Sequence, residues 1–277
     1  MSEQYKIWGK TGLPASSLVV AWNRDMSQLG NSVTDYLIGK LGGQNLAEIE
    51  PVDFFPLGGV TVEDNLIQFP ESKFYLCHTG AVLVFVSDPP SNKWYEFLNL
   101  ILDIAQECCR VKELYTVGGL VSLAAHTVPR GLVGTFTTAE FKAELSQYNL
   151  VAEMDYETPS EQRPTLNSFL LWTARRKTIP GVSLWAPIPF YLLGVGDPQS
   201  ERRVLEFFNQ RFNLTLDFSD IDNRVKNQNE KLARLRTEFP EIDGLITKLE
   251  SNQMLSDEEN EKLAKQVQES ITETEAD

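Results

Sequence analysis

The sequence predicts an α/β fold with a largely parallel sheet, followed by a separate helical region at the C-terminus. Apolar runs of strand length alternate with amphipathic stretches of helix length, which is typical of layered α/β proteins. The run at 81–86 is apolar without alternation, as expected for a central strand that is covered on both faces. Amphipathic helical stripes dominate the end of the chain, so we divide it into an α/β domain at 1–218 and a helical region at 219–277.

The first half of the chain alternates strands and helices. A strand is predicted at 17–22, and apolar residues then recur every four positions, as in a helix. These residues are Leu29, Val33, Leu37 and Leu41. After the central strand, Pro89-Pro90 breaks the chain before a helix with an apolar stripe over 94–108. A further strand at 114–117 is expected to end at Gly118-Gly119.

Capping residues mark two helix starts in the second half. The run Thr137-Thr138-Ala139-Glu140 has the pattern of a capping box, and Asp197-Pro198 supplies an N-cap with a first-turn proline. A helix is expected around 166–174 between them. An apolar segment at 182–193 follows, and because it contains Pro187 and Pro189 we expect no regular central strand through its middle.

The helical region carries a heptad-like seam. Apolar residues and one glutamine alternate at four- and three-residue spacing. They are Ile221, Val225, Gln228, Leu232, Leu235 and Phe239. Pro240 ends this helix, a second stripe covers 242–249, and Ser256 with Glu259 starts a third helix. A seam of under three heptads is marginal on its own, so we expect it to pack within the chain; packing between chains is the alternative.

Composition limits the classes of partner. A formal net charge of −14 opposes binding to nucleic acid, which relies on clustered Lys and Arg. No apolar run approaches the roughly 20 residues of a membrane helix, and the N-terminus lacks the pattern of a signal peptide. Cys77, Cys108 and Cys109 lack CxxC spacing and are interpreted as reduced thiols. We therefore predict a cytoplasmic protein without nucleic-acid or membrane partners.

Few residues suggest chemistry. His78 and His126 are too few for a metal centre or a nucleophile pair, and His126 is interpreted as a loop or capping residue, so no catalytic residue, metal or cofactor is predicted. Glycines at a strand end can admit a phosphate or carboxylate, although no complete nucleotide-binding motif is present. One hypothesis is therefore a small-ligand pocket, for a nucleoside or phosphate, formed by four residues near the strand ends. These are Asn23, Gly118, Gly119 and Arg130.

Aromatic and apolar residues suggest binding to proteins instead. Trp and Tyr are frequent at the centres of protein interfaces, which makes Trp185 and Tyr191 candidates for a recognition surface. Packing of Trp185 in the core is the alternative. Leu232 and Leu235 of the helical seam are candidates for a second surface.

Several short pieces of the sequence occur in an order typical of one family. The pieces are Leu18-Val19-Val20-Ala21-Trp22-Asn23, Leu29-Gly30-Asn31-Ser32-Val33, Trp94-Tyr95, Leu114-Tyr115-Thr116-Val117-Gly118-Gly119, Pro129-Arg130, Val133-Gly134, Leu184-Trp185, Pro189-Phe190-Tyr191 and Asp197-Pro198. Each piece alone is unspecific. Their order and spacing over residues 15–220 resemble the proteasome assembly chaperone 2 family.

The resemblance implies a three-layer α/β/α sandwich like that of nucleoside phosphorylases, self-assembly into rings or other homo-oligomers of three or more chains, and chaperoning of protein assembly. Family members that dock on proteasomes use a C-terminal hydrophobic residue, a tyrosine and one final residue. This chain ends Thr274-Glu275-Ala276-Asp277, so we do not expect docking by that route. Some relatives carry the label of an ATP-grasp ligase, for which this sequence shows no glycine-rich nucleotide loop.

The favoured hypothesis is a homo-oligomeric assembly chaperone that binds itself and another protein or complex subunit, without evident catalysis. The alternative is an enzyme or small-ligand binder that uses the pocket near Gly118 and Arg130. The sequence names neither the partner nor the oligomer number.

Overall fold

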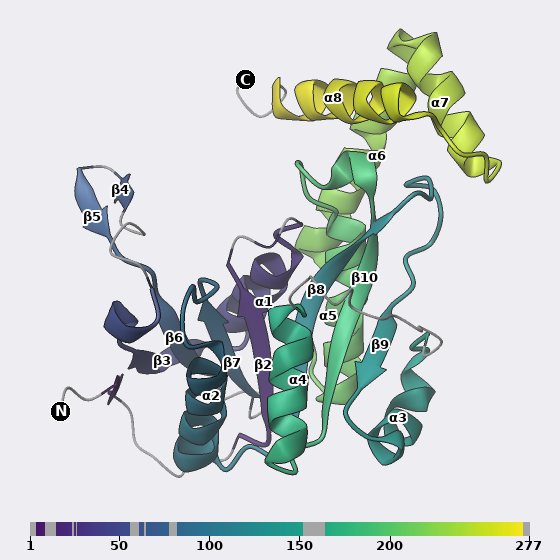
Figure 1. The fold of residues 1–277 in the computed structure, drawn as a ribbon. Helices are drawn as coiled ribbons and strands as arrows, with labels where there is room; N and C mark the ends of the chain where they lie inside the picture. The colour runs from purple at the N-terminus through teal and green to yellow at the C-terminus, as the bar shows by residue number, and fades with distance from the viewer. Residues whose placement is uncertain are drawn as a thin grey trace.

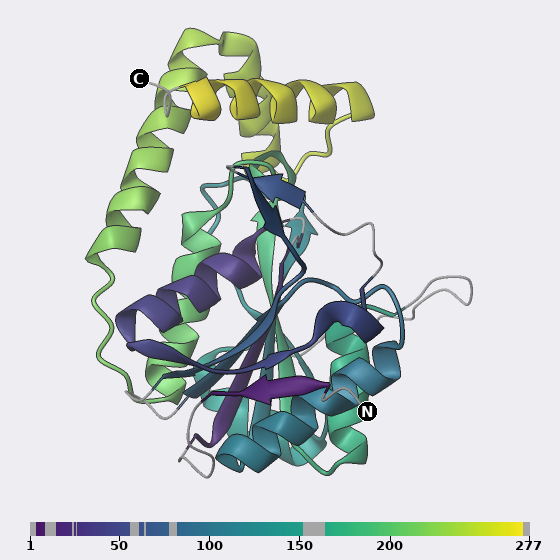
Figure 2. The ribbon, with the colours of Figure 1, turned by 90° about the vertical axis from the view of Figure 1, so that its left-hand side faces the viewer.

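The computed structural model describes residues 4–8, 15–23, 25, 27–55, 61–63, 65–77, 82–151 and 164–273 of the chain. Their fold is a three-layer α/β/α sandwich, with helices on both faces of an eight-stranded sheet (Figure 1). Three further helices follow at the C-terminus: the first begins beside the helical layer, and the other two lie beyond the carboxyl ends of the central strands (Figures 1 and 2). The predicted fold class is therefore confirmed.

The sheet is mixed, with its strands in the order β1-β3-β6-β7-β2-β8-β10-β9. Its strands are β1 Tyr5–Ile7, β2 Ser17–Trp22, β3 Gly43–Ile49, β6 Ser72–Cys77, β7 Val82–Ser87, β8 Glu113–Ser122, β9 Val133–Phe136 and β10 Gly181–Pro189. The four neighbours β7, β2, β8 and β10 are parallel, whereas the outer pairs are antiparallel. The expectation of a largely parallel sheet holds only at the centre, because the connection between β6 and β7 is too short for a crossover helix.

Helices cover each face in pairs. On one face lie α1 Leu29–Lys40 and α5 Pro198–Arg211, and on the other α2 Trp94–Cys109 and α4 Leu166–Arg176 (Figure 1). The strand β2 shows why a central strand is apolar throughout: Val19 faces the first pair, whereas Leu18 and Val20 face the second. A short helix, α3 Ala139–Leu145, follows the edge strand β9.

The predicted helix starts are confirmed, although Thr138 and not Thr137 caps α3; the Thr137 hydroxyl instead accepts the N–H of Gly181 at 2.8 Å. The side chains of Thr138 and Asp197 accept hydrogen bonds from the first turns of α3 and α5. Ser256 and Glu259 form a reciprocal capping box at the start of α8, in which each backbone N–H donates to the other side chain, at 3.0 and 3.3 Å. Each capping side chain binds a backbone N–H within three positions of it, so these caps could be predicted from neighbouring residues alone.

The expectation that prolines interrupt the segment after Gly181 is wrong. β10 runs through Pro187 to Pro189 and pairs with β8 over its whole length. Its other neighbour, β9, pairs with it from Val182 to Trp185. Pro187 and Pro189 lie beyond Trp185, where β10 no longer pairs with β9. Their nitrogens cannot donate a hydrogen bond, but no hydrogen bond to β9 is lost there.

The C-terminal helices are α6 Ser219–Glu238, α7 Pro240–Glu250 and α8 Asp257–Glu273. The side chains of Ile221, Leu232 and Leu235 are buried and belong to the same apolar cluster as the α1 and α5 face of the sheet. The expectation that the seam packs within the chain is thus confirmed. Among the described residues, no helix is both long enough and apolar enough to span a membrane.

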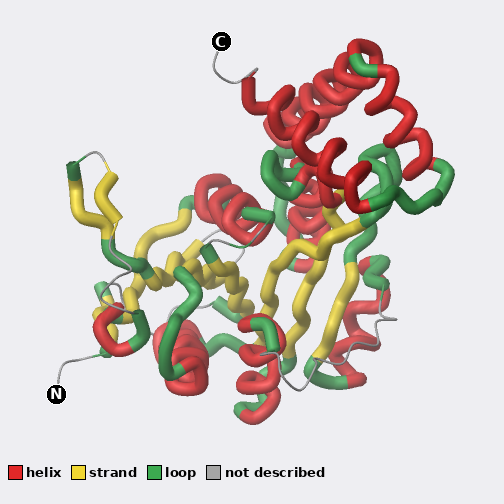
Figure 3. Tube along the Cα trace, turned by 45° about the horizontal axis from the view of Figure 1, so that its top comes forward, coloured by secondary structure: helices red, strands yellow, loops and turns green. Residues whose placement is uncertain are grey.

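A small hairpin stands apart from the main sheet. β4 Thr61–Glu63 pairs with β5 Leu66–Gln68 and with no other described strand, and the hairpin projects from the body beside β6 (Figures 1 and 3). Its position between β3 and β6 in the chain places it at the opposite end of the sheet from β9.

Candidate functional site

The parallel strands separate at their carboxyl ends, where open α/β sheets bind ligands. β2 pairs with β8 from Ser17 to Val20 and with β7 as far as Trp22. Past this ladder, Asp25 accepts hydrogen bonds from the hydroxyl of Ser27 at 2.9 Å and from the N–H of Gly119 at 3.4 Å. A carboxylate of the chain itself is therefore already bound to the backbone N–H of Gly119.

Gly118 and Gly119 lie inside β8, not at its end. They pair with Trp185 and Ala186 of β10, and the strand continues to Ser122. A Cβ atom on Gly118 would lie 2.6 Å from the Trp185 ring, and one on Gly119 would overlap Ser27. The predicted strand end is wrong because the glycines give room for close packing on both faces instead of forming a turn.

Asn23 follows β2 on the side of β7. Its backbone N–H donates to the carbonyl of Ser87 at 2.7 Å, and the residue is half-buried. The backbone hydrogen bonds thus tie Asn23 to β7, whereas Gly119 binds Asp25 on the side of β8.

Arg130 is fully engaged in a buried ion pair. Its Nε donates to Asp197 at 2.7 Å, and the two side chains are 4% and 0% exposed. Its Nη1 donates to the carbonyls of His126 and Val128, while Asp197 also accepts from the Ser200 hydroxyl at 2.7 Å. Because these groups satisfy each other, the guanidinium fixes the loop after β8 to the start of α5 and is already neutralised.

His126 and Tyr191 form a second buried contact at this end of the sheet. The Tyr191 hydroxyl oxygen accepts the backbone N–H of His126 at 2.6 Å and lies 2.9 Å from the ring Nδ1. Among the described residues the Tyr191 O–H has no acceptor other than Nδ1, so it donates to that nitrogen, which corresponds to the neutral ring with its proton on Nε2. Burial, with the nearby Arg236 and Arg130, lowers the pKa of His126 to about 4. His126 lies in the loop, as predicted, with a packing partner.

The C-terminal helices cover this end of the sheet. The hydroxyl of Thr127 donates to Glu250 of α7 at 3.1 Å, and Arg236 of α6 binds the same carboxylate at 2.7 Å. Gln228 of the seam donates to the carbonyl of Gly196 at 2.9 Å. Helix α8 packs against the residues that directly follow β10. The chain's own residues thus cover the strand ends and leave there a pocket of about 250 Å³, lined by residues that include Ser27, Gly196 and Gln228.

The four residues proposed for protein contacts are placed differently from one another. Tyr191, Leu232 and Leu235 are buried within the chain. Trp185 is half-buried, and its ring lies over Gly118 on the α4 side of the sheet. Two residues proposed for different roles, Trp185 and Gly118, are therefore in contact. Whether these residues bind a partner stays a prediction.

Trp185 borders a groove between the edge strand β9 and helix α4, with a volume of about 590 Å³. Its floor and walls are mainly apolar or aromatic, with one cation at the rim. The principal lining residues are Leu120, Phe136, Leu171, Trp172, Arg175 and Trp185. Sequence reasoning found only Trp185, because the groove is lined by four elements, β8, β9, α4 and β10, that only the fold brings together.

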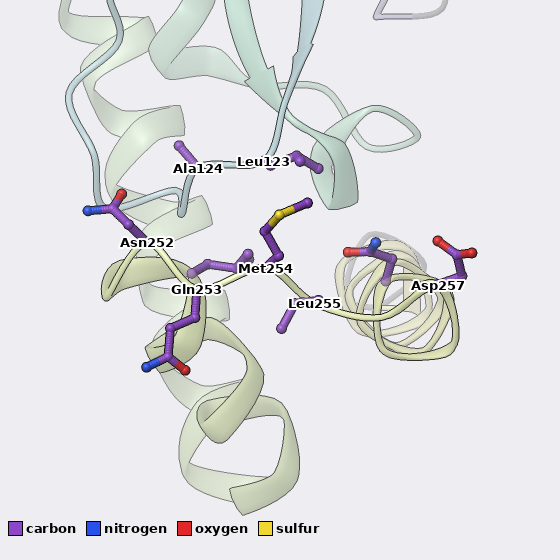
Figure 4. Close-up of a pocket in the computed structure, with 9 residues that line it drawn as sticks. Leu123, Ala124, Asn252, Gln253, Met254, Leu255 and Asp257 are labelled. Carbon is purple, nitrogen blue, oxygen red and sulfur yellow. The ribbon is translucent and has the colours of Figure 1, made fainter.

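A second pocket, of about 490 Å³, lies between the loop after β8 and the connection from α7 to α8 (Figure 4). The side chain of Met254 points towards Leu123, and both are more than half exposed. The Oδ1 atom of Asn260 is buried here and has no hydrogen-bond partner in the described part of the chain. A lone methionine in a polar stretch was the only sequence signal for this pocket.

Metal and thiol chemistry find no support among the described residues. Within them, no three His, Cys, Asp or Glu side chains are grouped as metal ligands would be, and His78 lies outside the described part of the chain. Cys77, Cys108 and Cys109 are free and buried, which agrees with reduced thiols. Burial raises the pKa of Cys77 to about 11, so its sulfur stays protonated.

The geometry defines an α/β/α protein whose strand ends are closed by C-terminal helices. The sequence profile of the PAC2 family matches residues 18–236, and the chain belongs to this family. An uncharacterized protein of Methanocaldococcus jannaschii is 21% identical over 227 residues, covering 80% of this chain and 83% of that protein.

Two solved structures have the same fold. A proteasome-assembly chaperone homologue of Mycobacterium tuberculosis is 17% identical with a TM-score of 0.67, covering 79% of this chain and 94% of its own. PbaB of Pyrococcus furiosus, an archaeal proteasome activator, is 17% identical with a TM-score of 0.66, covering 84% and 98%. At these identities the likeness establishes the fold.

Proposed function

We propose that this chain is a homo-oligomeric, protein-binding member of the PAC2 family that assists the assembly of another protein complex. The observation that carries the proposal is the exposed apolar hairpin. Its residues Val62, Leu66, Ile67 and Phe69 are each at least 60% exposed. Contiguous apolar surface of this kind marks sites of protein contact.

The covered strand ends support the same function. The place where a phosphorylase-like protein would hold a small ligand contains the buried Arg130–Asp197 pair and lies under α6 to α8. The groove beside Trp185 and the pocket beside Met254 instead expose apolar side chains at the surface. Such surfaces fit protein side chains better than a charged metabolite.

The solved relatives support a role in assembly. One is named a proteasome-assembly chaperone homologue and another an archaeal proteasome activator, and both names describe action on a multi-subunit protein. We take from them the class of partner, a subunit of a larger protein complex, and not its identity.

Purification of the tagged full-length protein from its native host at low salt tests this function. Light scattering on the eluate should give a mass several times that of the 31.3 kDa chain, and mass spectrometry should identify a partner in fixed ratio. The tag fused to an unrelated protein serves as the control.

A thermal-shift panel of nucleosides, nucleotides and phosphate completes the test. No stabilisation is expected, since Arg130 is already neutralised by Asp197. A shift that grows with ligand concentration, together with a monomeric eluate free of partners, would favour the small-ligand alternative instead.

A further inference from the structure

The β4–β5 hairpin is apolar on both faces. Val62 and Ile67 are cross-strand partners and so share one face, whereas Leu66 points to the other. Their side chains are 68%, 63% and 64% exposed. If the hairpin packed one face on its own chain, the apolar side chains of its other face would remain in water. Both faces are buried only when the hairpin inserts between two apolar surfaces.

The hairpin also lacks intrinsic support. It has two strands of three residues each, and an isolated two-stranded hairpin is at best marginally stable in water. The described part of the chain provides no third strand for it. A partner that covers the hairpin would therefore stabilise its fold as well as its apolar side chains.

The groove between β9 and α4 offers two such walls. Phe136 of β9 lies on one side and Leu171 and Trp172 of α4 on the other, above a floor that includes Leu120 and Trp185. Its volume of about 590 Å³ lies within the roughly 300–1,000 Å³ of pockets that bury a ligand. Hairpin and groove lie at opposite ends of the sheet, so they can meet only between two molecules.

Charge is complementary between the two surfaces. The segment 61–69 contains two acidic residues and no Lys or Arg. At the groove, Arg175 lines the rim and Arg176 lies 5.0 Å from the Trp172 ring centroid. Both arginines are exposed, and neither forms an ion pair with another residue that the structure describes. In a chain of net charge −14, such a basic rim is a local exception suited to a segment whose sequence is acidic.

We propose that the β4–β5 hairpin of one chain inserts into the β9–α4 groove of a second copy of this chain. This inference rests on the proposed self-assembly and names its surfaces. Because the contact joins two different surfaces, it is head-to-tail and builds rings or open chains. Pairing of two hairpins with each other would instead bring two segments of acidic sequence together.

Engineered cysteines test the contact directly. Chains carrying Ile67→Cys are mixed with differently tagged chains carrying Ser168→Cys, a substitution on the groove side of α4. The native cysteines are buried and should not compete. Mild oxidation should give a disulfide between the two chain types. A mixture with Val52→Cys in place of Ile67→Cys should not cross-link, although Val52 is 84% exposed.

Exchanging the charges of the two surfaces distinguishes loss of the contact between chains from misfolding of the variant. The double variant Arg175→Glu, Arg176→Glu should lose the oligomer on light scattering, and adding Glu63→Lys and Asp64→Lys should restore it. Restoration cannot arise from a misfolded variant. Cross-linking of Ile67→Cys chains with each other in preference to the mixed pair, or an oligomer unchanged by the arginine substitutions, would overturn the hairpin contact and leave self-assembly in place. A wild-type chain that is monomeric at every concentration would overturn both.

Discussion

His126 should make the stability of the protein depend on pH below neutrality. Its pKa is about 4 in the folded chain, whereas an unperturbed histidine has 6.5. The unfolded chain therefore binds the extra proton first, and the free energy of unfolding falls as the pH drops from 6.5 towards 4. One pKa unit corresponds to about 1.4 kcal/mol, so the full loss is about 3 kcal/mol, of which about 2 kcal/mol has occurred at about pH 5.

The structure gives the cause of this penalty. The ring is buried, lies near the cations of Arg236 and Arg130, and uses its unprotonated Nδ1 to accept the Tyr191 hydroxyl. Protonation would bury a third positive charge and remove that acceptor. The carboxylates of Glu250 and Asp197 oppose the shift but are the smaller effects.

Urea denaturation at several pH values measures the effect, with His126→Asn as the matched variant. The asparagine can place an amide oxygen near the position of Nδ1 and does not titrate. Other carboxyl groups titrate in both proteins, so the informative quantity is the difference in unfolding free energy between the two chains. This difference should change by about 2 kcal/mol between pH 7 and 5. Parallel pH profiles for the two proteins would refute the reasoning.

Three substitutions test the packing. Gly118→Ala should cost about 1–3 kcal/mol because its methyl group overlaps the facing tryptophan ring, whereas Gly39→Ala, with open space in α1, should not destabilise the protein. Asp197→Leu should cost about 3–5 kcal/mol because its arginine partner is left buried and unpaired. Leu232→Ala should cost about 2–5 kcal/mol, since the side chain is fully buried. Urea denaturation measures all of them; a change below about 0.5 kcal/mol in any of the destabilising variants would contradict its burial or contact.

The sequence was informative where the signal is local or repeated. Capping residues such as Thr138 and Asp197 lie within a few positions of the groups they bind. The stripe of α2 repeats over four turns, and β7 is apolar at nearly every position. The seam of α6 likewise identified Leu232 and Leu235 as residues that need a packing partner.

Long-range contacts account for what the sequence did not reveal. The strands β4 and β5 have three residues each, too few to show alternation. The sequence places Gly118 at a strand end, because its need for space comes from Trp185, on another strand. Arg130 was interpreted as a free cation because Asp197, which neutralises it, lies 67 positions away. Each missed feature depends on which distant segments of the chain the fold brings together. The composition of the chain does not encode these contacts.

The position of the C-terminal helices decides which surfaces remain for partners. Helices α6 to α8 close the carboxyl ends of the parallel strands, and the contacts of Glu250 with Thr127 and Arg236 hold them there. Exposed apolar side chains then remain at both lateral ends of the sheet, on the hairpin and in the groove beside Trp172. If these ends join copies of the chain, the pocket between Leu123 and Met254 stays open on every copy (Figure 4). An assembled ring would therefore present this apolar pocket repeatedly, a geometry suited to a partner that is itself built from several subunits.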